Sequence, residues 1–220
     1  MYYFCDHNIN QIKKLIFNYH IMKKLIAIVA LAVTMFVAGN AQAQIIAYLG
    51  YAPETFKFTD SYNSTYSYSY YFQGFNMGGA YNFELPFVSG LGVTPGLQFR
   101  MNIRGHDACT DTQILIDVPI LANYAIPVTK DITVAPFVGP MLSIALSGKT
   151  KGNSTDYSLN WYGEHGDYNR FNLYGVIGVA GSYTNFMLYA GYRFGLLDIH
   201  KAPGFKIKTN GFFLGVGYSF

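Results

Sequence analysis

The sequence predicts an all-β protein, an eight-stranded antiparallel transmembrane β-barrel with short periplasmic turns and longer extracellular loops. Large apolar residues alternate with small or polar ones along segments that exceed the about 5–6 residues of an ordinary strand. The connections between these segments are alternately short and long. Only 12 % of the residues are charged, whereas 18 % are aromatic. This composition indicates an outer surface that does not face water throughout.

Residues 22–43 have the layout of a secretory signal peptide. Two lysines are followed by an apolar run over Leu25–Ala38 and then by small residues. The cleavage site is predicted between Ala43 and Gln44. A transmembrane helix is the alternative, but the apolar run is shorter than the roughly 20 residues that a helical span needs.

Residues 1–21 precede a methionine, Met22, that already begins a complete signal. We interpret them as an over-called N-terminal extension, so the predicted barrel domain covers residues 44–220. The lysines lost with the leader account for the formal charge of +3, and nothing in the remaining charge indicates a nucleic-acid partner. Without Cys5, the lone Cys109 allows no internal disulfide and no cysteine-based zinc site, and no cofactor is expected.

The period-two pattern defines eight candidate strands. In chain order they are Ile45–Ala52, Phe72–Glu84, Leu91–Arg104, Thr112–Tyr124, Ile132–Ser147, Asn169–Tyr183, Phe186–Leu197 and Ile207–Phe220. Several of them are longer than the about 9–11 residues that a tilted membrane strand needs.

The second, third and seventh segments show the alternation most clearly. In the third, Leu97 and Phe99 lie on one face, and Gln98 and Arg100 lie on the other. A soluble sandwich would also alternate, but its outer faces would carry more lysine and glutamate than these faces do. A closed barrel also satisfies every backbone amide inside lipid, which an open sheet does not.

The connections fall into two classes. Short ones follow the second, fourth and sixth segments (LPFVSG, AIPVTKD and YTN), and mostly longer, more polar ones follow the other segments. The longest of these are 53–71 and the connection after the fifth segment. Outer-membrane barrels have short periplasmic turns and longer external loops. Both termini then lie on the periplasmic side, which requires an even number of strands and fits eight.

Four stretches resemble the PorT-like outer-membrane β-barrel proteins that are common in Bacteroidetes. They are LIDVPILANY (Leu115–Tyr124), APFVGPMLSIALSGK (Ala135–Lys149), LYAGYRFGLLDI (Leu188–Ile199) and FFLGVGYSF (Phe212–Phe220). The resemblance covers nearly all of 44–220 and implies export to the bacterial outer membrane. It also implies a C-terminal assembly signal on the last strand, with the lipid-facing residues Phe212, Leu214, Val216, Tyr218 and Phe220.

The interior of an eight-stranded barrel is just wide enough for side chains to fill it, so no open channel is expected. The charged residues predicted to point inward are Glu84, Arg100, Arg104, Asp117 and Arg193. Unpaired charge inside a membrane protein is costly. Since Glu84, Arg100 and Asp117 lie on three neighbouring segments, we predict a structural network of ion pairs. A ligand or proton path is the alternative.

The predicted external loops carry the histidines His106, His165 and His200. A lipid-modifying enzyme would need a nucleophile and a histidine base near the rim. Neither GHDACTD nor GEHGDY has two histidines at a metal-binding spacing. We therefore expect no enzyme and no metal site, and we interpret these histidines as solvated loop residues.

Serine alternates with Tyr66, Tyr68 and Tyr70 just before the second segment. Tyrosine suits a membrane interface, so these residues fit an outward-facing aromatic belt. If they point outward, a bulge near residues 70–73 is needed to restore the phase of the segment that follows. A binding surface is the alternative.

The leading hypothesis is a non-enzymatic outer-membrane protein with a structural role in envelope integrity, or in adhesion through its external loops. One alternative is a component of a protein secretion or assembly system, which the PorT resemblance permits, and another is a lipid-modifying enzyme. The expected partners are outer-membrane lipid and lipopolysaccharide, together with the barrel-assembly machinery and its periplasmic chaperones. Secretion-system subunits join them under the first alternative.

Overall fold

The computed structural model describes residues 43–60, 67–106, 108–153, 158–164, 166–201 and 204–220. The predicted extension 1–21 and the signal peptide 22–43 lie outside the described residues, except for the backbone of Ala43, and both remain predictions. In the described part of the chain, no helix is long and apolar enough to cross a membrane.

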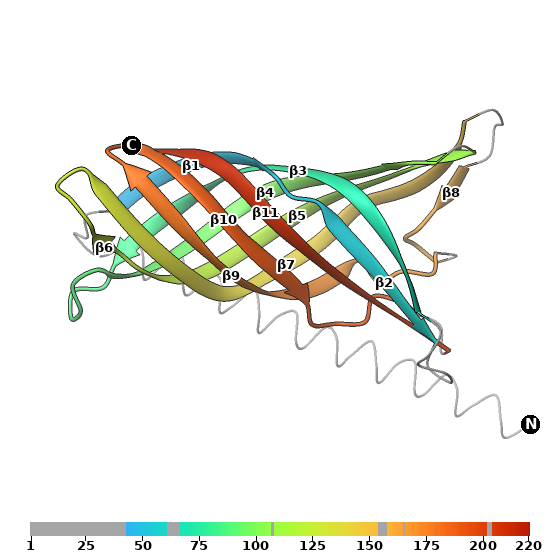
Figure 1. The fold of residues 1–220 in the computed structure, drawn as a ribbon. Coiled ribbons are helices and arrows are strands. Elements are labelled where there is room, and N and C mark those ends of the chain that lie inside the picture. Colours follow the sequence, from blue (N-terminus) through green and yellow to red (C-terminus); the bar gives the residue numbers. More distant parts are fainter. Residues whose placement is uncertain (1–42, 61–66, 107, 154–157, 165, 202–203) are drawn as a thin grey trace, which may run out of the picture. The chain divides into compact units, whose positions relative to one another are not determined.

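Antiparallel strands form a closed ring (Figure 1). The longer strands are β1 (Ala43–Tyr51), β2 (Glu54–Asp60), β3 (Ser67–Glu84), β4 (Leu91–Gly105), β5 (Cys109–Tyr124), β7 (Ile132–Gly152), β9 (Phe171–Tyr183), β10 (Phe186–Gly195) and β11 (Phe205–Ser219). The short strands β6 (Ile126–Pro127) and β8 (Ser158–Asn160) pair with β7. Because β1 pairs with both β11 and β3, the first and last strands close the ring.

Strands β1 and β2 occupy one position in the ring. Tyr51 pairs with Phe75 of β3, and Glu54, three residues further on, pairs with Phe72. The register is also maintained against β11 on the other side. The intervening Ala52 and Pro53 therefore interrupt the strand without shifting it, since proline has no N–H to donate to the ladder. The ring consequently has eight positions, which confirms the predicted fold class.

The prediction of a long loop over residues 53–71 is wrong. Most of this stretch is strand, because β2 covers Glu54–Asp60 and β3 already begins at Ser67. Its proline, lysine, serines and tyrosines are typical of a loop in a sequence. Backbone hydrogen bonds between strands do not depend on those side chains, so the ladder continues past the apolar part of the strands.

Apolar side chains point away from the barrel axis, as predicted. On β3, Phe75 is 53 % exposed and Met77 is 62 % exposed, whereas Asn76 between them is only 7 % exposed. The same contrast on β4 separates the exposed Leu97 from the buried Gln98. The outer surface of the barrel is therefore apolar, which is the arrangement that a bilayer requires.

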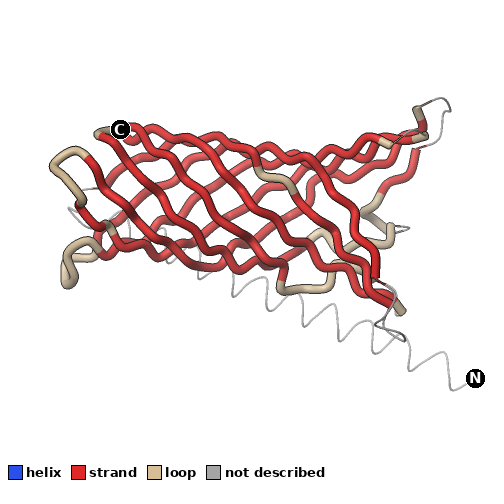
Figure 2. The backbone as a smooth tube through the Cα atoms, viewed as in Figure 1, coloured by secondary structure: helices blue, strands red, loops and turns tan. Residues whose placement is uncertain are grey.

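The two ends of the barrel differ (Figure 2). At one end, called the turn end here, Thr184 and Asn185 alone join β9 to β10, and residues 85–90 join β3 to β4. The other end, called the loop end, includes the described parts of 153–170 and 196–204, and the 21-residue strand β7 ends there.

Candidate functional site

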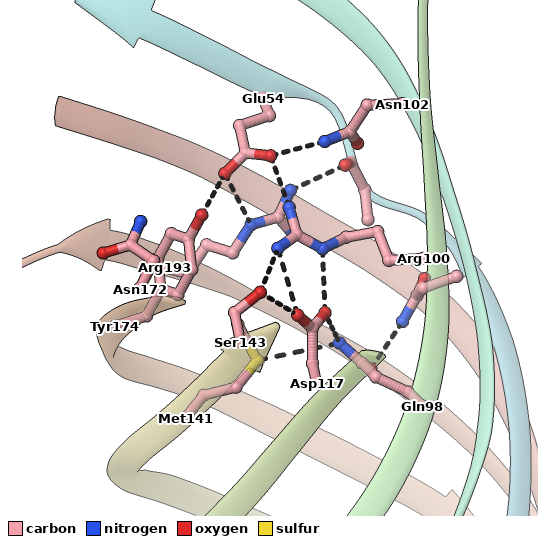
Figure 3. Close-up of polar contacts among 12 residues, drawn as sticks. Glu54, Gln98, Arg100, Asn102, Asp117, Met141, Ser143, Asn172, Tyr174 and Arg193 are labelled. Carbon is pink, nitrogen blue, oxygen red and sulfur yellow. Dashed lines mark hydrogen bonds and ion pairs between the residues drawn. The ribbon is translucent and has the colours of Figure 1, made fainter. Parts of the chain in front are cut away.

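Arg100 lies at the centre of a polar network inside the barrel (Figure 3). Its side chain on β4 points toward Asp117 on the neighbouring strand β5, with 2.8 Å between Arg100 Nε and Asp117 Oδ2. Arg100 Nη1 donates to Glu54 Oε2 on the opposite side. Ser143 on β7 donates its hydroxyl to Asp117 Oδ1 at 2.5 Å. Arg100 and Asp117 are both 0 % exposed.

Glu54 is the second acid of the network and was missed by the sequence analysis. It is 1 % exposed and accepts hydrogen bonds from Arg100, from Asn102 Nδ2 and, at 2.6 Å, from the hydroxyl of Tyr174. It belongs to β2, which was predicted to be loop. The period-two pattern of Glu54, Phe56 and Phe58 was the signal for an inward face, but Pro53 hid its continuity with β1.

Arg193 of β10 connects the network to the interruption in the first strand. Arg193 Nη2 donates to the backbone carbonyls of Ala52, at 2.7 Å, and of Pro53, at 3.1 Å. Its Nε lies 4.0 Å from Glu54 Oε1. Glycines make room for the inward carbonyls, because a Cβ on Gly74 would lie 2.1 Å from the oxygen of Ala52 and a Cβ on Gly211 would lie 2.1 Å from that of Pro53.

The network is electrically balanced, with two arginines facing two carboxylates. All four groups are removed from solvent, so each charge depends on the others for the stabilisation that water would supply. Three of the predicted interior residues, Arg100, Asp117 and Arg193, thus lie together. The cluster is a buried network of ion pairs, and its structural role remains a prediction.

The structure places the other two predicted members, Glu84 and Arg104, outside this network. Glu84 is exposed at the turn end, where its Oε1 accepts from the backbone N–H of Gly90 at 2.9 Å. Arg104 lies nearer the loop end, with its Nη1 at 3.6 Å from Asp111 Oδ2. Alternation gives the face of a strand on which a residue lies, but not its height along the barrel, and the height separates these residues from Arg100.

Aromatic and aliphatic side chains fill the barrel interior on the loop side of the network. The members of this aromatic plug are Phe56, Phe72, Leu115, Ala145, Trp161, Tyr162, Ile199 and Ile207. Polar contacts anchor the two loop aromatics, because Trp161 Nε1 donates to Thr150 Oγ1 at 2.8 Å and Gln113 Nε2 donates to the Tyr162 hydroxyl at 2.6 Å. Trp161 and Tyr162, which follow β8, are therefore folded into the barrel.

Burial raises the pKa of two tyrosines in this loop. The pKa of Tyr162 rises to about 12. The pKa of Tyr168 also rises to about 12, through burial and then through the negative charge of Asp167. Both phenols therefore stay protonated, and the plug stays uncharged, across the ordinary pH range.

The tyrosines before the second predicted segment line the mouth of the barrel. Tyr66 lies outside the described residues. The ring of Tyr68 stacks on Phe58 with 4.8 Å between the ring centroids, and the guanidinium of Arg104 lies 3.9 Å over the ring of Tyr70. The register of β3 is unbroken from Ser67 onward. The predictions of an outward-facing aromatic belt and of a bulge near residues 70–73 are therefore wrong.

A cavity of about 450 Å³ occupies the barrel on the turn side of the network. It extends from Gln98 and Arg193 at the network to Thr184 and Asn185 in a turn. The interior thus has three levels along the barrel: the cavity, the ion-pair network and the aromatic plug.

The predicted C-terminal residues face outward along β11 and at the residue after it. Phe212, Leu214, Val216, Tyr218 and Phe220 are all exposed large hydrophobic residues. This placement fits contact with lipid, and their role as an assembly signal remains a prediction. The predicted cleavage site between Ala43 and Gln44 coincides with the start of β1.

Of the loop histidines, His106 and His200 are described and His165 is not. The ring of His200 contacts those of Tyr168 and Phe205. Among the described residues there is no group of three or more histidine, cysteine, aspartate or glutamate side chains placed to hold a metal ion. Cys109 is a free thiol.

The closed ring, its apolar exterior and its filled middle define a transmembrane β-barrel of the outer-membrane type. Residues 39–201 match the family described as outer membrane protein beta-barrel domain, and the chain belongs to this family. Its membership places the protein in the outer membrane. The match is to outer-membrane β-barrel proteins in general, and the PorT-like identity remains a prediction.

Several solved outer-membrane proteins match this chain over most of their length. Ail, the attachment invasion locus protein of Yersinia pestis, is 18 % identical and matches over 81 % of this chain and 99 % of that chain, with a TM-score of 0.47. Neisserial surface protein A is 18 % identical over 81 % of this chain and 97 % of that chain, with a TM-score of 0.44. A major outer membrane protein of Thermus thermophilus is 13 % identical and matches over 81 % of this chain and 99 % of that chain, with a TM-score of 0.45. No curated protein matches the sequence.

Proposed function

We propose that this chain is a non-enzymatic outer-membrane anchor whose loop end faces the cell exterior and supports envelope integrity or adhesion. The observation that carries the proposal is the sealed and electrically balanced middle of the barrel. Arg100, Asp117 and Ser143 are all 0 % exposed, so solutes have no route past them. A barrel that is closed in this way acts through its outer wall and its ends.

The outer wall at the loop end favours contact with the phosphate groups of lipopolysaccharide. Lys208 of β11 lies directly opposite Lys57 of β2, and Lys206 lies two residues further along the same exposed face. Like charges in directly opposed positions destabilise a strand pair. Within the described residues none of these lysines has an acidic partner, and anionic headgroups would supply one.

The resemblance to PorT supports a second function, in protein secretion or assembly. It rests on the four stretches quoted above, which run through β5, β7, β10 and β11. In this function the loop end or the outer wall would bind secretion-system subunits, and the sealed interior would remain purely structural.

The experiment compares a deletion strain complemented with three chains. They are the wild type, a loop-tip variant with 61–66 and 154–157 replaced by Gly and Ser at equal length, and a turn variant with 86–89 replaced in the same way. We expect all three to form heat-modifiable barrels, and only the loop-tip variant to fail in surface adhesion and detergent resistance. Full rescue by the loop-tip variant contradicts the proposal.

Two further measurements on the same strains distinguish the alternatives. Co-purification of secretion subunits with the wild-type chain supports the PorT-like function. A change in lipid A mass on deletion that the wild type reverses, and that His106→Ala or His165→Ala does not, identifies an enzyme. Protease added to intact cells should cut at the loop end, and cutting only after the outer membrane is opened contradicts the orientation.

A further inference from the structure

The cavity on the turn side of the network has a polar wall and an apolar wall. On the polar wall, Asn82 Oδ1 accepts from Thr94 Oγ1 at 2.8 Å and from Asn123 Nδ2 at 3.0 Å. Asn76 and Gln98 continue this wall toward the network, with 3.0 Å between Asn76 Nδ2 and Gln98 Oε1. The wall therefore presents a row of amide groups and a hydroxyl.

The apolar wall is formed by residues of β5, β7, β9 and β11. It includes Pro119, Leu121, Ala135, Phe137, Val176 and Phe213. The rings of Phe137 and Phe213 are nearly parallel, at 18° and with 6.3 Å between their centroids. Keeping such a surface in contact with water costs free energy. This cost is a reason for a partly apolar molecule, rather than water alone, to occupy the cavity.

The cavity walls carry almost no charge. Among the described lining residues only Arg193 and Glu84 are charged. Arg193 is balanced within the network and Glu84 lies at the turn, bonded to a backbone N–H. An ion entering the cavity would lose water without gaining a counter-charge. The chemistry of the walls therefore selects an uncharged ligand.

Small side chains keep the cavity open. Ala80, Ala135 and Ala180 point into it, whereas the equivalent space on the loop side is filled by Phe56, Phe72 and other members of the aromatic plug. Its volume of about 450 Å³ is within the range of about 300–1,000 Å³ for small-molecule pockets. The barrel is thus filled at one end and left hollow at the other.

We propose that the turn-end cavity binds an uncharged small molecule that has amide or hydroxyl groups along one side and a hydrocarbon or aromatic group along the other. The polar side lies against Asn82, Asn123 and Gln98, and the apolar side lies against Phe137 and Phe213. This inference is independent of the proposed role of the loop end.

The test uses the protein purified from outer membranes and placed in lipid nanodiscs. The probe is N-acetyl-L-phenylalanine amide, which is uncharged and carries two amides and one ring. We expect saturable NMR shifts of the side-chain amides of Asn82, Asn123 and Gln98. N-acetyl-L-phenylalanine, which bears a carboxylate, should bind at least about ten-fold more weakly because its charge would lose hydration.

Two variants locate the site. Ala180→Phe fills the cavity and should weaken binding by about ten-fold or more because the added ring takes the ligand's space. Ala190→Phe, the matched control on the exposed face of β10, should leave binding unchanged. Asn123→Leu keeps the branched shape of the side chain and should weaken binding through the loss of an amide, which tests the site if Ala180→Phe fails to fold.

Four outcomes overturn the proposal. The first is the absence of saturable shifts with the wild type up to the solubility limit of the probe, which would mean that the cavity holds water only. The second is equal binding of the amide and the carboxylate. The third is that Ala180→Phe and Ala190→Phe weaken binding of the probe equally. The fourth is that neither Ala180→Phe nor Asn123→Leu changes binding of the probe.

Discussion

Arg100 bridges the two buried acids in the middle of the barrel. It holds two carboxylates on different strands, Glu54 and Asp117, and also contacts Ser143 at 3.3 Å. Removing one member of a buried ion pair leaves the remaining charge without compensation, which costs more than the pair itself contributes. A substitution that removes the charge of Arg100 should therefore destabilise the fold far more than the loss of side-chain volume alone would.

We predict that Arg100→Met lowers the free energy of unfolding by about 3–5 kcal/mol, because Glu54 and Asp117 are left buried and facing each other. The measurement is urea unfolding in detergent, followed by the mobility shift of the unheated barrel on a gel. Arg104→Met is the matched control and should cost about 1 kcal/mol or less, since its pair with Asp111 is partly exposed. Equal losses for the two variants would show that the network does not stabilise the fold.

Tyr162 in the aromatic plug and Tyr168, which packs against the plug, predict a change at alkaline pH. The pKa of both Tyr162 and Tyr168 is about 12 in the folded protein, against about 10 for an ordinary tyrosine. Because the folded-state pKa is raised, the stabilising contribution is complete below about pH 10 and is lost between about pH 10 and 12.

Trp161 reports this change, since it is the sole tryptophan of the chain and its ring contacts those of both tyrosines. We expect its emission to stay at short wavelength up to about pH 10 and to shift to the red as the pH approaches 12. In the double variant Tyr162→Phe/Tyr168→Phe the shift should move to higher pH. An unchanged titration curve in that variant would rule out these tyrosines as the cause.

At the scale of the elements, the interruption between β1 and β2 is a built feature of the barrel. Pro53 removes one backbone donor, and the carbonyls of Ala52 and Pro53 turn inward to Arg193. Gly74 and Gly211 on the two flanking strands leave the space that these carbonyls occupy. The interruption therefore needs glycine on both sides.

We predict that Gly74→Ala and Gly211→Ala each destabilise the barrel by about 1–3 kcal/mol, since the new Cβ would overlap a backbone oxygen that is held in place. Urea unfolding measures the loss. Gly79→Ala on β3 is the control, because its nearest neighbour would be the Ile46 oxygen at an ordinary 3.6 Å. If Gly79→Ala costs as much as Gly74→Ala, the loss comes from glycine flexibility and not from the interruption.

The sequence predicted the parts of the site that follow from strand periodicity. Arg100, Asp117 and Arg193 each lie within an uninterrupted alternating segment, so their inward direction was readable. The inward direction of Glu54 could not be predicted in this way, because Pro53 separates it from the apolar pattern of β1. Trp161 and Ile199 lie in loops, which have no period, and only the folded chain brings them into the barrel.

At the scale of the whole molecule, the eight positions and the outward apolar face follow from composition, alternation and connection length. These signals are local and repeat in every strand, so an error in one strand does not change the fold class. The ends of the strands were less predictable. β2, β3 and β7 continue beyond the apolar band, where polar residues occupy strands and loops alike.

The position of the barrel in the membrane predicts a dependence on anionic lipid. Lys57→Gln/Lys208→Gln should lower the thermal midpoint of unfolding in vesicles that contain lipopolysaccharide, because phosphate contacts are lost. In zwitterionic vesicles the same change should have no effect or raise the midpoint, since it removes a like-charge pair. Lys149→Gln/Lys151→Gln on the extension of β7 is the control and should not distinguish the two membranes. Equal effects in both membranes would contradict lipid contact at β2 and β11.

The polar network also bears on how the barrel assembles. Glu54 comes from the beginning of the described chain and Arg193 from near its end, while Arg100, Asp117, Ser143 and Tyr174 come from strands between them. A sheet that lacks its last hairpin would hold an acid inside the bilayer with one of its two cations missing. Partly closed intermediates are thereby disfavoured, and insertion of the final strands should be tightly cooperative with closure.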